Sequence, residues 1–217
     1  MVVSPRSLLV GAIAGGLQLL TACAATQPVR VLAGGESRWV ASVGGPMLPH
    51  HVPTGILPYA TVGRMWARSN DVTLTADLHL LPAAFGVAGI DAGVARRLRA
   101  ASGRAPELTG QAQLYAFAGN GGARVYPNFT GNASWQVAAG TIVYAGAATT
   151  VQFTGPTAVI ASPLAGIQQD IGRRWVLQLE GKWMAADVDM RSGLLEGENS
   201  ISGRGGLSLQ LGVQVKR

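Results

Sequence analysis

V-T-L-T-A-D-L-H-L, at residues 72–80, alternates apolar and polar residues without a break, and this pattern decides the fold class. A period of two is typical of a β-strand with one apolar and one polar face, and no helical period fits the stretch. The same alternation returns in W-V-L-Q-L-E-G-K-W at 175–183 and in L-S-L-Q-L-G-V-Q-V at 207–215. These stretches predict an all-β protein.

Extending the pattern along the chain predicts an antiparallel up-and-down β-barrel of ten strands. Ten is even, as single-chain bacterial barrels require, and eight is the alternative if the first strand or the segment around Pro163 does not pair. The predicted strands are 36–44, 56–68, 71–81, 85–98, 107–118, 128–138, 141–153, 157–168, 173–185 and 204–216. Inner turns are expected at 69–70, 99–106, 139–140 and 169–172, outer loops at 45–55, 119–127 and 186–203, and short connections at 82–84 and 154–156.

The composition indicates a surface that does not face water throughout. Only 13% of the 217 residues are charged, against about 25% in soluble domains, and the mean hydropathy is +0.26. No apolar run after Leu20 reaches the length of about 18 residues that a spanning helix needs. A closed barrel is the other structure that satisfies every backbone group inside lipid.

The tryptophans indicate which strand faces meet lipid. Trp175 and Trp183 share one apolar face, and eight residues of tilted strand separate them by about 20 Å along the membrane normal, the spacing of two aromatic girdles. The opposite faces carry Thr, Gln, Asn, Asp, Glu and Lys, so a lumen filled with polar residues is expected. Segments 141–149 and 157–168 are apolar on both faces, which leaves open a soluble, lipocalin-like barrel that binds an acyl chain.

The first residues have the layout of an export signal, with a positive Arg6, an apolar stretch from Leu8 to Leu20, and small residues after it. The end of this region, Leu20-Thr21-Ala22-Cys23, resembles the lipobox of bacterial lipoproteins, and Cys23 is the only cysteine in the chain. The resemblance implies cleavage before Cys23 and a covalent lipid such as palmitate on it. It also implies sorting to the outer membrane of a Gram-negative bacterium, because Ala24, not Asp, follows the cysteine.

Three parts of the chain follow from this layout: a signal peptide at 1–22, a lipid-anchored tether at 23–35, and a β-barrel domain at 36–217. A simple secretory signal with a free cysteine is the alternative interpretation of the N-terminus. No cofactor other than the lipid on Cys23 is expected.

Six polar side chains are candidates for the barrel interior. An Asp that orients a His is half of a hydrolase site, but no motif supplies a nucleophile, so mutual pairing inside the lumen is the preferred interpretation and no enzymatic activity is expected. The candidates are Asp77, His79, Asp91, Gln178, Glu180 and Lys182.

Other candidate sites are incomplete. His50 and His51 lack the further ligands that zinc needs. Asp187, Asp189 and Glu198 match part of a calcium-loop spacing, but Arg191 and Ser192 stand at positions where the loop needs a ligand and a glycine. No metal site is therefore predicted.

The charge and the lumen together limit the function. Fifteen of the seventeen basic residues are arginine, scattered or in turns without a nucleic-acid motif, so membrane lipids and other envelope proteins are the expected partners, and nucleic acid is not. A ten-stranded barrel filled with polar side chains leaves little aqueous channel. We therefore expect a structural, adhesive or accessory role in the cell envelope, with a small pore or a lipid-binding or hydrophobic-ligand-binding barrel as the alternative.

Overall fold

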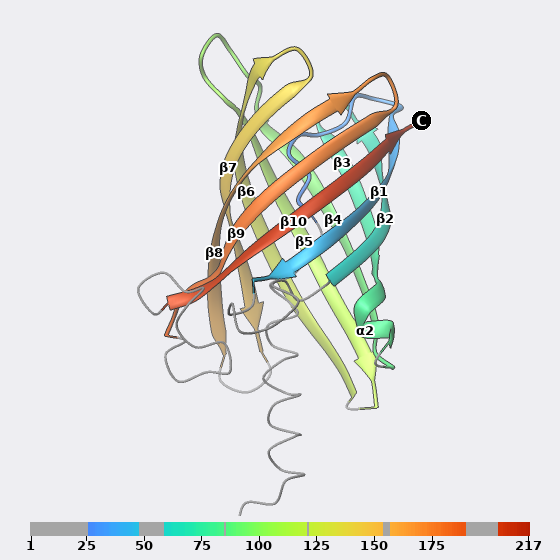
Figure 1. The fold of residues 1–217 in the computed structure, drawn as a ribbon, viewed down its shortest axis with the longest axis vertical. Coiled ribbons are helices and arrows are strands. Elements are labelled where there is room, and N and C mark those ends of the chain that lie inside the picture. Colours follow the sequence, from blue (N-terminus) through green and yellow to red (C-terminus); the bar gives the residue numbers. More distant parts are fainter. Residues whose placement is uncertain (1–25, 48–58, 85, 121, 154–156, 190–203) are drawn as a thin grey trace, which may run out of the picture.

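The protein folds into one closed barrel of antiparallel strands (Figure 1). The structure is a computed structural model and describes residues 26–47, 59–84, 86–120, 122–153, 157–189 and 204–217. The predicted up-and-down topology and the number of strands are confirmed. The strands are β1 (Ser37–Pro46), β2 (Tyr59–Ser69), β3 (Val72–His79), β4 (Ala88–Arg99), β5 (Glu107–Gly119), β6 (Gly122–Ala138), β7 (Thr141–Gln152), β8 (Ala158–Ile171), β9 (Trp175–Asp189) and β10 (Arg204–Lys216).

Each strand pairs with its neighbours in the sequence, and β1 closes the barrel by pairing with β10. The closing register places Trp39 opposite Val215 and continues to Pro46 opposite Ser208. Closure removes both sheet edges, so the backbone donors and acceptors of the strands are satisfied within the barrel wall.

The two ends of the barrel differ. We call the end that holds the start of β1 and the finish of β10 the terminal end; residues 70–71, 100–106, 139–140 and 172–174 connect strands there. At the opposite end, which we call the loop end, β1, β3 and β9 finish, and the short helix α2 (Leu80–Ala84) follows β3. Figure 1 shows the C-terminus and α2 at opposite ends.

One of the predicted connections is wrong, and another contains a helix that was not predicted. The loop expected at 119–127 is mostly strand, because β6 begins at Gly122 and pairs with β5 from Gly119 onward. Arg124 and Pro127 resemble loop residues in the sequence, but pairing with β5 satisfies the backbone, and Tyr126 packs edge-to-face on Phe117 in the lumen at 6.3 Å between ring centres. The connection at 82–84 belongs to α2.

The two faces of the wall have opposite chemistry. Side chains that point into the lumen are buried and mostly polar, and those that point outward are exposed and apolar; Leu78 and Ile90 are 54% and 51% exposed. A barrel folded in water has the reverse distribution, because apolar burial drives its folding. Lumen-facing polar residues include Thr61, Thr75, Gln113, Asn128, Thr130, Asn132, Gln178, Gln210 and Gln214.

Among the residues that the structure describes, no helix is long and apolar enough to cross a membrane.

Candidate functional site

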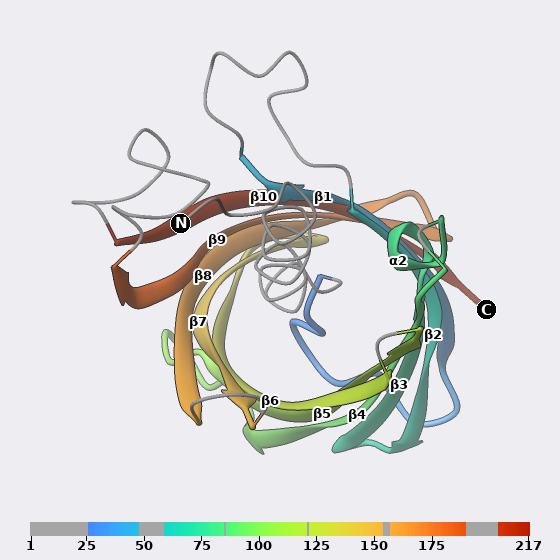
Figure 2. The ribbon, with the colours of Figure 1, turned by 90° about the horizontal axis from the view of Figure 1, so that it is seen from below.

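The lumen holds the segment that sequence analysis assigned to a tether. From Thr26 to Leu32, which we call the lumenal segment, the chain lies within the ring of strands (Figure 2), and the exposed residues Ala33, Gly34 and Gly35 lead from it to β1. Gln27 and Val29 are each 1% exposed, and Leu32 is 2% exposed. The lumenal segment is therefore part of the barrel core.

Lumen-facing side chains bind the backbone of the lumenal segment. Gln178 Nε2 donates to the carbonyl of Gln27 at 2.9 Å, and Asn132 Nδ2 donates to the carbonyl of Pro28 at 3.3 Å. The amide of Leu32 donates to Thr73 Oγ1 at 2.7 Å. These strand residues come from β9, β6 and β3, so the segment is tied to three sides of the wall.

Apolar side chains of the lumenal segment fill the apolar parts of the lumen. Val29 packs against Tyr144 and Ala148 of β7 and Leu164 of β8. These are the two strands that carry apolar residues on both faces, and the contact with Val29 explains why their inner face is not polar. Leu32 in turn packs with Val40 and Met65.

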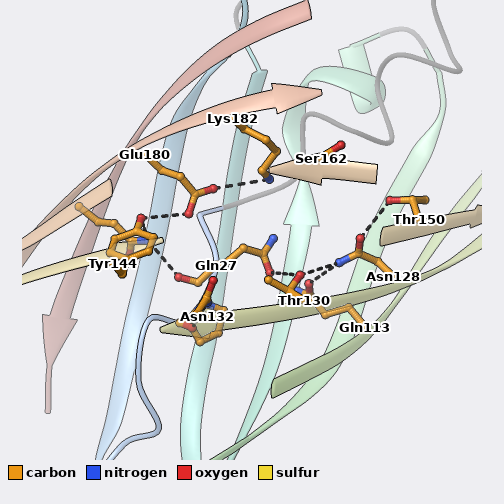
Figure 3. Close-up of polar contacts among 12 residues, drawn as sticks. Gln27, Gln113, Asn128, Thr130, Asn132, Tyr144, Thr150, Ser162, Glu180 and Lys182 are labelled. Atoms are coloured by element: carbon orange, nitrogen blue, oxygen red, sulfur yellow. Dashed lines mark hydrogen bonds and ion pairs between the residues drawn. The ribbon is translucent and has the colours of Figure 1, made fainter. Parts of the chain in front are cut away.

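A second group of contacts surrounds Glu180 (Figure 3). Glu180 is fully buried and forms an ion pair with Lys182, whose Nζ lies 3.5 Å from Oε1. Tyr144 donates its hydroxyl hydrogen to Glu180 Oε2 at 3.0 Å, and Gln178 Nε2 donates to the Tyr144 oxygen at 2.9 Å. Gln178 therefore links the Glu180 group to the lumenal segment.

A third group extends across the lumen from Gln27. Thr130 Oγ1 donates to Gln27 Oε1 at 3.4 Å, and Asn128 Nδ2 donates to Thr130 at 3.3 Å (Figure 3). Thr150 Oγ1 donates to Asn128 Oδ1 at 3.0 Å. This chain of hydrogen bonds couples β6 and β7 to the lumenal segment.

The His79 group lies toward the loop end. His79 Nε2 is 3.0 Å from Asp91 Oδ2, and His79 Nδ1 is hydrogen-bonded to the Tyr59 hydroxyl. Gln113 Nε2 donates to Asp91 Oδ1 at 3.3 Å, and Asp77 stands opposite Asp91 in the register of β3 and β4.

Tyr59, His79 and Asp91 are linked in the same order as the nucleophile, the base and the orienting carboxylate of a hydrolase site. Chemistry at such a site needs a substrate within reach of the nucleophile. The exposed fractions of these three residues are only 3%, 2% and 2%, and the rings of Phe117 and Tyr115 lie 5.1 and 6.1 Å from the imidazole. This arrangement therefore fits a packed polar group of the core.

All six candidate interior residues lie in the lumen, in two separate groups. Asp77, His79 and Asp91 belong to the His79 group, and the three from β9 belong to the Glu180 group. Sequence reasoning missed Tyr59 and Tyr144, which complete these groups. Each occupies one of the alternating strand positions whose side chains point into the lumen, and this alternation was the signal that could have found them. Cys23, His50, His51, Arg191, Ser192 and Glu198 lie outside the described residues.

A cavity of about 220 Å³ opens between the lumenal segment and the wall near the terminal end. Its lining includes Arg30, Arg38, Lys216 and Asp170. Arg38 pairs with Glu36 at 2.8 Å, and Lys216 pairs with Asp170 at 2.9 Å, so much of its charge is already neutralised.

No family model matches the chain, and no curated protein sequence matches it. Among solved structures, it is similar to the translocator domain of the autotransporter NalP from Neisseria meningitidis, with 12% identity, 97% of each chain covered and a TM-score of 0.47. An anion-selective porin from Comamonas acidovorans has 14% identity over 75% of this chain and 49% of that one, with a TM-score of 0.36. The attachment invasion locus protein Ail of Yersinia pestis has 11% identity over 86% of this chain and all of that one, with a TM-score of 0.28.

Proposed function

We propose that this chain is an outer-membrane β-barrel lipoprotein whose lumen is closed by its own N-terminal segment and whose role in the cell envelope is structural, adhesive or accessory. The observation that carries this proposal is the inverted wall, with polar side chains inside and apolar side chains outside.

The outward face has the properties of a surface in contact with lipid. Leu114, Phe129, Leu179 and Leu211 are between 43% and 52% exposed, a large apolar area that would be unfavourable in water. Tryptophans stand at both ends of this band, as in the aromatic girdles of membrane barrels. Trp39, Trp66, Trp135 and Trp175 lie toward the terminal end and Trp183 toward the loop end.

The lumenal segment argues against a role as an open pore. Its backbone hydrogen bonds and the packing of Val29 and Leu32 fill the lumen from inside. A porin-like role would require this segment to leave, which would expose apolar lumen residues and leave the side-chain donors of Gln178 and Asn132 without these partners.

The cavity is the observation that favours the second candidate, a ligand-binding barrel. Its volume of about 220 Å³ is smaller than the roughly 300 to 1,000 Å³ typical of small-molecule sites. Its lining is mostly polar, with a smaller apolar part from residues such as Val31, Met65 and Ile142, and this mixture with four charged side chains does not suit an acyl chain. The ligand-binding role is therefore the weaker of the two.

Lipidation of Cys23 sets a geometric condition. Thr26 packs against Gly212, which lies four residues before Lys216, about 10 Å inside the terminal end along a tilted strand. Three residues reach at most about 11 Å. A lipid anchor on Cys23 is therefore expected in the leaflet at the terminal end, because the loop end, eight residues of β10 away from Gly212, lies beyond this reach.

Two measurements on the purified mature chain test the proposal. Migration on a gel should shift after heating, and the protein should need detergent to stay monomeric. Planar bilayers containing the chain should show no stable single-channel conductance. A folded monomer that is stable without detergent would refute the membrane-spanning barrel, and steady channels would refute the closed lumen.

Site-specific labelling tests the lumenal segment directly. In a chain with Cys23→Ser, a single thiol introduced by Val29→Cys should resist a polar maleimide, because the side chain of residue 29 is buried. The matched control is Ser102→Cys in the exposed turn between β4 and β5, which should react readily. Equal labelling of the two thiols would show that the lumenal segment is not held in the barrel.

A further inference from the structure

An outward-facing tryptophan near the terminal end stands between two arginines. The guanidinium carbons of Arg64 and Arg217 lie 5.7 and 5.9 Å from the centre of the Trp39 ring. Trp39 is opposite Arg64 on β2 and opposite Val215 on β10, and Val215 is opposite Trp175 on β9. Arg64, Trp39, Val215 and Trp175 form one row across four strands, and Arg217 follows two residues after Val215. We call Trp39, Arg64, Trp175 and Arg217 the basic aromatic patch.

Within the part of the chain that the structure describes, no acid is paired with the two arginines of the patch. Arg64 has one hydrogen-bond partner, Ser37 Oγ at 3.4 Å, and within the described residues no carboxylate lies within 4.0 Å of the Arg64 or Arg217 guanidinium. Arg38, Arg97 and Lys216, which also lie near this end, are each paired with an acid; Arg97, for example, lies 3.1 Å from Asp71. Arg64 and Arg217 are therefore available to an external anion.

The patch has the geometry of a site for a phosphate group. A guanidinium presents several N–H donors in one plane and binds phosphate oxygens in pairs. A tryptophan ring attracts the cation to its face and holds it in place. Trp39 is 43% exposed and Trp175 is 49% exposed, so the rings can lie among lipid chains and headgroups while the guanidiniums reach the phosphate.

We propose that the basic aromatic patch binds the headgroup phosphate of an anionic phospholipid in the leaflet at the terminal end. This inference rests on the proposed membrane-spanning barrel. A lipid fits better than free phosphate, because the patch lies on the outward face beside the apolar side chains of Val215 and Leu211 and not in a water-filled cleft.

The test uses the mature chain in detergent micelles and counts bound phosphatidylglycerol by native mass spectrometry, with phosphatidylcholine and inorganic phosphate as separate arms. The variant Arg64→Gln with Arg217→Gln should lower the apparent affinity for phosphatidylglycerol about thirtyfold, because each basic residue at an anionic surface contributes about 1 kcal/mol, or about fivefold. Trp39→Leu should lower it as well, since the ring orients both cations.

The matched control removes the same charge at the same end. Arg96 and Arg99 are exposed near the β4–β5 turn and have no cation–π contact within the described residues, so Arg96→Gln with Arg99→Gln should leave the affinity nearly unchanged. Equal losses in the two double variants would overturn the site, and so would equal binding of phosphatidylcholine or competition by inorganic phosphate. Failure of the wild-type chain to insert into vesicles would instead refute the proposed spanning barrel.

Discussion

Adjacent substitutions on β10 test which face of the wall meets lipid. Leu209 points outward, is 39% exposed and has only Gly45 and Gly181 opposite it, so an arginine there would find no counterion. Gln210 points into the lumen, is 3% exposed and stands opposite Glu180. Leu209→Arg should therefore destabilise the barrel in a bilayer, and Gln210→Arg should be milder because the new cation gains a carboxylate.

The register gives the size of this effect. On β10, Leu207 is opposite Trp183 and Val215 is opposite Trp175, so Leu211 is midway between the two girdles. Leu209 is two residues from this midpoint, about 5 Å along the membrane normal. Arginine costs about 2 to 4 kcal/mol at the midplane and about 0 to 1 at the interface, so we expect about 3 kcal/mol for Leu211→Arg and about 2 for Leu209→Arg.

Equilibrium folding into liposomes, followed by denaturant titration, measures these costs. About 2 kcal/mol is close to a thirtyfold change in the folding constant, and about 3 kcal/mol exceeds a hundredfold. A larger loss of folding free energy for Gln210→Arg than for Leu209→Arg would show that the lipid-facing and lumen-facing sides of the wall have been assigned the wrong way round. Equal losses at Leu209 and Leu211 would contradict the depth assigned to them.

Three further substitutions test the anchor and the lumen. Cys23→Ser should abolish incorporation of labelled palmitate and leave an uncut or differently cut precursor; unchanged labelling would disprove the lipobox assignment. Lys182→Met should cost about 3 to 5 kcal/mol of stability, because Glu180 would remain as a buried carboxylate without its cation, and the double variant with Glu180→Gln should recover much of the loss in a thermal melt in detergent. His79→Phe should lower the melting temperature, because it removes the contacts to Asp91. Hydrolase assays with ester and peptide substrates should show no activity in the wild type or in the variant. Activity in the wild type that is lost in the variant would overturn the non-catalytic role of His79.

Local patterns determined much of the barrel wall. In β3, β9 and β10, alternation alone shows which residues share the inward face and which share the outward face. The side chains of a strand alternate between its two faces whatever the strand pairs with. For this reason Asp77, Glu180 and Lys182 could be placed on a polar face before the fold was known. The start of β6 could not, because pairing with β5 overrode the turn-forming character of its first residues.

The sequence by itself predicted the antiparallel barrel and the two faces of the clearest strands, because alternation depends on neighbours two residues apart. It favoured ten strands over eight, and the closed pairing of β1 with β10 decided for ten. Only the tertiary structure decided what fills the lumen. Arg30 donates to Ser134 Oγ at 2.9 Å across a separation of 104 residues, and Val29 meets Tyr144 and Leu164 from two other strands. Such contacts depend on the barrel's radius and register, and no local pattern encodes either quantity. Residues 26–32, a short mixture of apolar and polar residues, are therefore compatible with a tether in the sequence and become core once the wall closes around them.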